Sequence, residues 1–153
     1  MVNVMNAIKI LLLASIISFV LSGCTVTEVR PELNDIQQLQ AHAHAAYEAK
    51  EYELAITRYQ EVQTYLDKDP YVWFRLGNCY SHLQQPDEAI NAYRKAVFFD
   101  PTMSKAWHNM GVMQLRQTAN TWTQMLVHTL QSDPLYHKAE RYSQDTLKAL
   151  NQK

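Results

Sequence analysis

The chain of 153 residues contains little glycine, proline or cysteine. Three Gly and five Pro are too few for the frequent turns of a β-sandwich, and two Cys are too few for a disulfide scaffold. The net charge is -1, and no run of Lys or Arg is dense enough to follow a phosphate backbone, which argues against nucleic acid as a partner. Helix-favouring Ala, Leu, Gln and Glu are abundant, so we expect one all-α domain.

Known catalytic and cofactor-binding motifs are also missing. The sequence has no Gly-rich phosphate loop, no Gly-x-Ser-x-Gly and no His-Glu-x-x-His. His42 and His44 are two residues apart, so a helix would turn them to different faces, and no Cys–His set has zinc-ligand spacing. Glu51 and Glu53 lie at a predicted helix start, where the helix dipole accounts for them. The sequence predicts neither an enzyme nor a metal site, and no cofactor or small-molecule substrate.

The first 23 residues differ from the rest of the chain. Lys9 is their only charged side chain, and an apolar run extends from Ile10 to Leu21. A membrane-spanning helix needs about 20 apolar residues, and this run is shorter, so it predicts a targeting segment. The run ends in Leu21-Ser22-Gly23-Cys24, which closely resembles the lipobox of bacterial lipoproteins.

This resemblance implies a signal peptide of residues 1–23, cleavage before Cys24 and attachment of lipid, including palmitate, to its thiol. The alternative is an ordinary secretory signal or an uncleaved anchor. Thr25 is not the Asp that retains lipoproteins at the inner membrane in the enteric-type sorting rule, so we expect the outer membrane, facing the periplasm. Residues 24–34 lack an apolar period and predict a tether. Cys79 then has no internal disulfide partner and is expected to be a buried thiol, an intermolecular bridge being the alternative.

A repeat of 34 residues runs through the rest of the sequence. Leu39, Trp73 and Trp107 are 34 apart, as are Ala43, Gly77 and Gly111. The middle copy carries the fullest pattern, with an aromatic, a small residue and a terminal proline at fixed spacing: Trp73-x2-Leu76-Gly77-x2-Tyr80, Ala89-x3-Tyr93 and Pro101. This pattern resembles the tetratricopeptide repeat nearly position for position.

The resemblance implies an α-solenoid of three helix pairs over residues 35–134, the copies spanning about 36–69, 70–103 and 104–134. The third copy departs from the pattern, because Gln114 replaces the expected Tyr, and Trp122 or Thr123 occupies the place of the small Ala. An apolar stripe within residues 135–153 predicts a C-terminal capping helix, because the last repeat would otherwise leave its apolar side in water. Seven helices are therefore predicted after the signal peptide.

Members of this family usually bind peptides or helices in a concave groove lined by the first helix of each pair. By helical geometry, the residues beside each core stripe are expected to line that groove. They are Gln40, His44 and Tyr47 in the first copy, Phe74, Asn78 and His82 in the second, and Lys105, His108, Asn109, Val112 and Arg116 in the third. Such groups suit an extended chain or a helix with some acidic side chains. The alternative is an ordinary solvated helix face.

Two functions fit these features. The first is an outer-membrane-anchored periplasmic adaptor or scaffold that binds another protein through the groove and the membrane through Cys24, for example in pilus or secretion-system assembly. The alternative is an accessory binding subunit of a periplasmic enzyme complex that processes cell wall or glycans.

Overall fold

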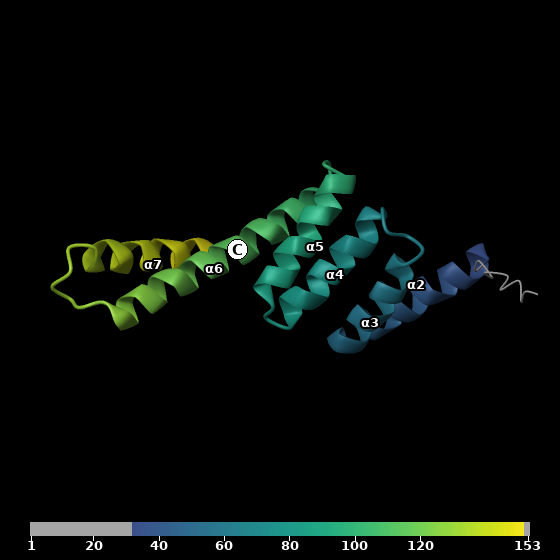
Figure 1. Ribbon diagram of the computed structural model, residues 1–153, viewed down its shortest axis with the longest axis horizontal. Coiled ribbons are helices and arrows are strands. Elements are labelled where there is room, and N and C mark those ends of the chain that lie inside the picture. The colour runs from purple at the N-terminus through teal and green to yellow at the C-terminus, as the bar shows by residue number, and fades with distance from the viewer. Residues whose placement is uncertain (1–31, 152–153) are drawn as a thin grey trace, which may run out of the picture. The chain divides into compact units, whose positions relative to one another are not determined.

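The computed structural model describes residues 32–151, which form six α-helices and no β-strand (Figure 1). The helices are α2 (Leu33–Glu48), α3 (Tyr52–Gln63), α4 (Pro70–His82), α5 (Pro86–Phe99), α6 (Ser104–His128) and α7 (Tyr136–Leu150). The predicted signal peptide, the lipid site Cys24 and all but the last residues of the predicted tether lie outside the described residues. Between residues 32 and 151, no helix is long and apolar enough to cross a membrane.

Successive helices pack on one another in the manner of a solenoid. The helix α2 packs on α3 and α4 on α5, while α3 also packs on α4, and α5 on α6 (Figure 1). Three-residue connections separate the helices of the first two pairs, so the partners must run antiparallel. The predicted all-α, tetratricopeptide-type solenoid is confirmed.

The same turn joins the helices of the first two pairs. Lys50 and Gln84, which are 34 residues apart, have positive φ angles of 63° and 57°. In each turn the next amide donates back five residues, from Glu51 to the Ala46 carbonyl and from Gln85 to the Tyr80 carbonyl, at 3.0 and 2.9 Å. This pattern is a Schellman motif, which stops the first helix and starts the second.

The third copy does not turn at the corresponding position, which is Thr118. A β-branched residue strongly disfavours a positive φ angle, because its Cβ substituents crowd the backbone. The helix α6 instead continues for 25 residues, and the Thr118 hydroxyl donates to the Gln114 carbonyl one turn back, at 2.9 Å. The expected third helix pair is therefore a single helix, and the predicted count of seven helices is wrong: the described residues contain six.

The helix α7 packs along the later part of α6, where the rings of Trp122 and Tyr142 lie 5.2 Å apart (Figure 1). Its buried side chains, Ala139 and Ser143, are one helical turn apart, as expected for a helix with one covered face. The predicted C-terminal helix is thus present, and its partner is the extension of α6.

Two apolar clusters form the core of the solenoid. The first lies between α2, α3 and α4 and includes Ala92 of α5, and the second lies between α4, α5 and α6. Ala55 and Ala89 occupy equivalent positions in the first two copies, and both are fully buried. Cys79 is fully buried in the first cluster, and burial raises the pKa of its thiol to about 12. The thiol therefore remains protonated and poorly nucleophilic at neutral pH.

The two helical glycines of the repeats have different surroundings. A Cβ added at Gly77 would lie 2.5 Å from the Tyr93 ring, whereas a Cβ added at Gly111 would meet no atom within 4 Å among the described residues. We expect Gly77→Ala to lower the free energy of unfolding by about 1–3 kcal/mol, because the buried ring must move. Gly111→Ala should raise it by up to about 1 kcal/mol, because alanine is the better helix former.

Chemical denaturation of the two variants and the wild type, followed by circular dichroism, measures both changes. Equal stabilities for Gly77→Ala and Gly111→Ala would contradict the close crossing of α4 and α5.

Candidate functional site

A cavity of about 260 Å³ opens on the face formed by α2, α4 and α6, the first helices of the three copies. Every copy contributes to it. Its lining contains Tyr47, then Asn78, Ser81, His82 and Tyr93, and finally Asn109, Val112, Met113 and Arg116. Six of the eleven residues predicted for the groove converge here: Tyr47, Asn78, His82, Asn109, Val112 and Arg116.

The side chain of Asn78 lies at the centre of the lining and is only 8% exposed. Its Oδ1 accepts two hydrogen bonds, from the Tyr93 hydroxyl at 2.8 Å and from Asn109 Nδ2 at 3.0 Å. These bonds fix the amide and link α4 to both α5 and α6. Within residues 32–151, Nδ2 of Asn78 donates to no partner, so its N–H groups are available to an acceptor in the cavity, such as a peptide carbonyl.

One end of the cavity is aromatic. The His82 ring stacks on Tyr52 with centroids 4.3 Å apart and planes within 5° of parallel, and the Tyr47 hydroxyl lies 3.4 Å from His82 Nε2. Arg75 lies over the Tyr47 ring at 5.0 Å from its centroid, while its Nε donates to the Tyr71 hydroxyl at 2.6 Å. These contacts hold the aromatic wall in one arrangement, which lowers the entropy lost when a partner binds.

The other end of the cavity carries a cation. Arg116 is exposed on α6, and among the described residues its side chain donates only one long hydrogen bond, from Nη1 to Gln84 Oε1 at 3.5 Å. Most of its donor capacity remains free for an acidic group of a partner, because a guanidinium carries five N–H donors. The cavity therefore combines an aromatic wall, a fixed amide and a guanidinium.

The other five residues predicted for the groove do not line this cavity. Gln40 lies on α2, His44 pairs with Glu48 on that helix, with a 3.7 Å separation, and Lys105 is exposed on α6. Phe74 is half buried, with its ring centroid 6.1 Å from that of Tyr93, so it supports the second core cluster. His108 lines a different hollow on α6.

The contributions of Tyr93 and Tyr52 were missed by sequence reasoning. Tyr93 was assigned to the core for its position in the repeat, and its ring is indeed buried. A buried tyrosine hydroxyl usually has a hydrogen-bond partner, however, and this preference was the available signal for its bond to Asn78. Among residues 32–151, no three His, Cys, Asp or Glu side chains are grouped to hold a metal ion.

Comparison with known proteins identifies the repeat. Residues 70–103 match the tetratricopeptide repeat family, at the bounds predicted for the middle copy. The fold is thus an α-solenoid that carries a tetratricopeptide repeat, a module that is typically non-catalytic and binds other proteins. These findings support a role as a protein-interaction adaptor.

The chain is also similar in sequence to parts of two larger proteins. Over 95 residues the chain is 32% identical to the general transcriptional corepressor ssn6 of Schizosaccharomyces pombe (strain 972 / ATCC 24843). Over 78 residues it is 33% identical to tetratricopeptide repeat protein 37 of Xenopus laevis. The matches cover 58% and 50% of this chain and 8% and 5% of the relatives, so the chain spans less than a tenth of the length of either relative.

Tyr59 and Tyr93 occupy equivalent positions in two copies but have different hydrogen bonding. Both rings are buried, yet the Tyr59 hydroxyl has no hydrogen-bond partner among residues 32–151, because His44 stands where the next copy has Asn78. We expect Tyr93→Phe to lower the free energy of unfolding by about 0.5–1.5 kcal/mol through loss of its bond to Asn78.

Tyr59→Phe serves as the matched control. It should leave the stability unchanged or raise it by up to about 1 kcal/mol, because it removes a buried polar group without a partner. Thermal and urea unfolding of both variants test this difference. A larger loss for Tyr59→Phe than for Tyr93→Phe would contradict the assigned bonding.

Proposed function

We propose that the protein is a lipid-anchored adaptor of the bacterial envelope, held at the periplasmic face of the outer membrane. Its solenoid binds a segment of a partner protein in the cavity between α2, α4 and α6. The observation that carries the proposal is the convergence of side chains from all three repeat copies around one amide, Asn78, whose oxygen is fixed by two hydrogen bonds. The assembly or positioning of a pilus or secretion machine is the role we assign to this adaptor.

The chemistry of the cavity defines the partner. The N–H groups of Asn78 suit a backbone carbonyl, and the aromatic wall around His82 suits an apolar or aromatic side chain. Arg116 suits a carboxylate at the far end. The partner is therefore an extended segment or a short helix that carries at least one acidic side chain.

The membrane anchor rests on the sequence Leu21-Ser22-Gly23-Cys24 and its resemblance to a lipobox. Lipid on this cysteine holds the repeat domain at the membrane without a membrane-spanning helix. Several acyl chains on one cysteine hold a protein on a bilayer stably, since each buried CH₂ contributes about 0.8 kcal/mol.

The first test concerns the anchor. Cys24→Ser should abolish lipid attachment, because a hydroxyl does not accept the thioether-linked lipid, and it should move the protein out of the outer-membrane fraction. Labelling of cells with radioactive palmitate, followed by membrane fractionation, measures both effects. Ser22→Ala is the matched control and should retain label and location. A Cys24→Ser protein that still takes up label in the outer membrane would refute the anchor.

The second test concerns the groove. Arg116→Glu reverses the charge at one end of the cavity, and Ser81→Trp fills the cavity, so each should reduce partner recovery about tenfold or more. Crosslinking in cells, detergent extraction and quantitative mass spectrometry measure the recovery. Arg94→Glu on α5 is the matched charge-reversal control, because within residues 32–151 the Arg94 side chain bonds only Asn91.

Each variant must first show the wild-type circular dichroism spectrum and melting temperature. If folded Arg116→Glu and Ser81→Trp recover the same partners in the same amounts as Arg94→Glu, the groove is not the binding site. Recovery of cell-wall or glycan-processing enzymes in place of envelope-assembly proteins would favour the accessory-subunit role.

A further inference from the structure

The second repeat shows how a helix pair is closed in this protein. The helix α5 covers α4 where the Tyr93 ring rests against Gly77, and where Lys95 Nζ lies 4.0 Å from the centroid of the Trp73 ring. The Trp73 indole also donates to the Asp67 carbonyl six residues earlier, at 2.6 Å. In a complete pair, the second helix thus places an aromatic ring against the glycine of the first helix and a cation over its indole ring.

The third copy retains the tryptophan and the glycine of the first helix but lacks the second helix that would cover them. The Trp107 indole donates to the Pro101 carbonyl six residues earlier, at 3.0 Å, so its backbone setting matches that of Trp73. Trp107 is nevertheless 50% exposed, and a Cβ on Gly111 would meet no atom of residues 32–151 within 4 Å. The side of α6 that a second helix would cover is therefore bare.

By the 34-residue period, a later segment of the chain should form the second helix of the third copy, but this segment does not cover Gly111. Residues 34 positions after Tyr93 and Ala96 are Val127 and Leu130, and they are 69% and 78% exposed instead of buried. They cannot fold back onto Gly111 while α6 continues straight through Thr118. The helix α7 covers the later part of α6 and ends at Leu150.

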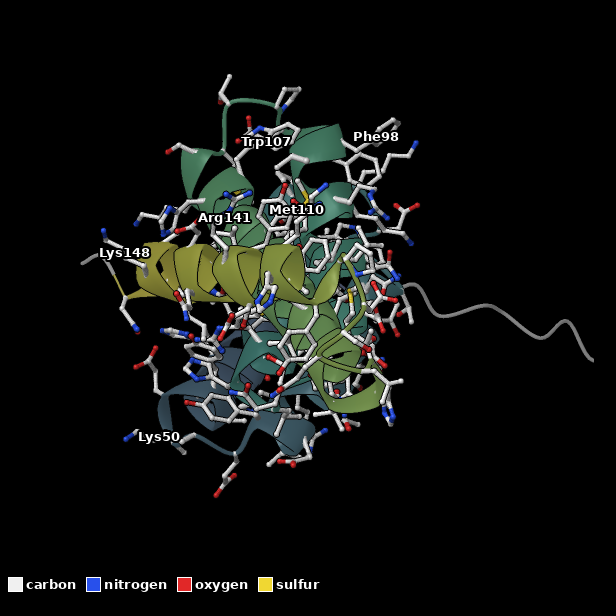
Figure 2. All side chains as sticks on the ribbon, turned by 90° about the vertical axis from the view of Figure 1, so that its left-hand side faces the viewer. Lys50, Phe98, Trp107, Met110, Arg141 and Lys148 are labelled. Carbon is white, nitrogen blue, oxygen red and sulfur yellow. The ribbon has the colours of Figure 1, made fainter. Side chains whose placement is uncertain are left out.

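A hollow of about 450 Å³ remains at the end of α7. It is lined by Trp107, His108, Gly111, Val112 and Leu115 from α6, and by Ala149 and Leu150 from the last turn of α7. In Figure 2, Trp107 and Phe98 lie above α7 near the edge of the view, whereas Met110 lies closer to the centre. Trp107 and Gly111 do not line the cavity of the proposed groove, so the hollow is a second surface.

We propose that this hollow binds an amphipathic helix of a partner protein, which completes the third repeat in place of the missing second helix. The helix brings an aromatic side chain that rests on Gly111, as Tyr93 rests on Gly77 in the complete pair. It carries acidic side chains on the flank that faces His108, which lines the hollow, and Lys105, one helical turn before His108 on α6. This inference does not depend on the groove or on the lipid anchor.

Charge and helix polarity support this occupant. His108 is the one charged or titratable side chain of the described lining, and Lys105 lies one helical turn before it on α6. An added helix antiparallel to α6 places its C-terminus beside the N-terminus of α6, which brings opposite ends of the two helix dipoles together.

A synthetic peptide with the sequence of residues 86–100 is a suitable probe, because α5 is the helix that fills the equivalent place in the second repeat. We expect the fluorescein-labelled peptide to bind the full chain saturably, as measured by fluorescence anisotropy. A peptide with Ala at the position of Tyr93 should bind about tenfold more weakly or worse, since it lacks the ring that rests on Gly111.

Variants of the full chain identify the surface. Gly111→Leu, which fills the hollow, should weaken peptide binding about tenfold or more, and Gly111→Ala should have a smaller effect. Val127→Ala, on an exposed position outside the hollow, should bind the peptide like wild type. Circular dichroism confirms that each variant is folded.

Three results would overturn the proposal. The first is the absence of saturable binding, or equal binding by wild type and folded Gly111→Leu. The second is dimerisation of the full chain in sedimentation that Gly111→Leu abolishes, which would make a second copy the occupant. The third is a short distance between spin labels at Gly111 and Val127, which would show the chain's own segment folded into the hollow.

Discussion

The contact between the Tyr93 ring and Gly77 is the constraint on which the rest of the structure depends. It sets the separation of α4 and α5, because any side chain at position 77 would collide with the ring. It also brings the Tyr93 hydroxyl to Asn78, the next residue along α4. Asn78 in turn receives a bond from Asn109 on α6. Packing within one repeat therefore fixes the polar centre of the cavity and joins that repeat to the next.

The sequence predicted the parts of the fold that rest on packing. Trp73, Leu76, Gly77 and Ala89 recur or match at fixed spacing because each must fit a neighbour of given size, and that requirement is visible as a 34-residue period. The continuity of α6 depends instead on a backbone angle. Lys50 and Gln84 accept positive φ and Thr118 resists it, a distinction that hydrophobic spacing does not carry.

The candidate site was predictable in outline only. A helical stripe predicts which residues share a face, and six of its members do meet in the cavity, among them Asn78 and Arg116. The neighbouring helix then covers one edge of that face, as the burial of Phe74 against the second core cluster shows. The extent of this cover depends on the angle between helices, which a single sequence does not specify. The hydrogen bonding of Asn78 likewise depends on residues 15 and 31 positions away.

The continuous helix α6 has a consequence for geometry at longer range. Its 25 residues form a rod of about 37 Å, at roughly 1.5 Å of rise per residue. Gly111 of the hollow and Arg116 of the cavity lie on this one rod, five residues apart, which separates them by about 7.5 Å along its axis. Two ligands held at these places would be spaced and oriented by the pitch of a single helix, with no hinge between them. The domain would then fix the distance between two bound molecules as well as bind each of them.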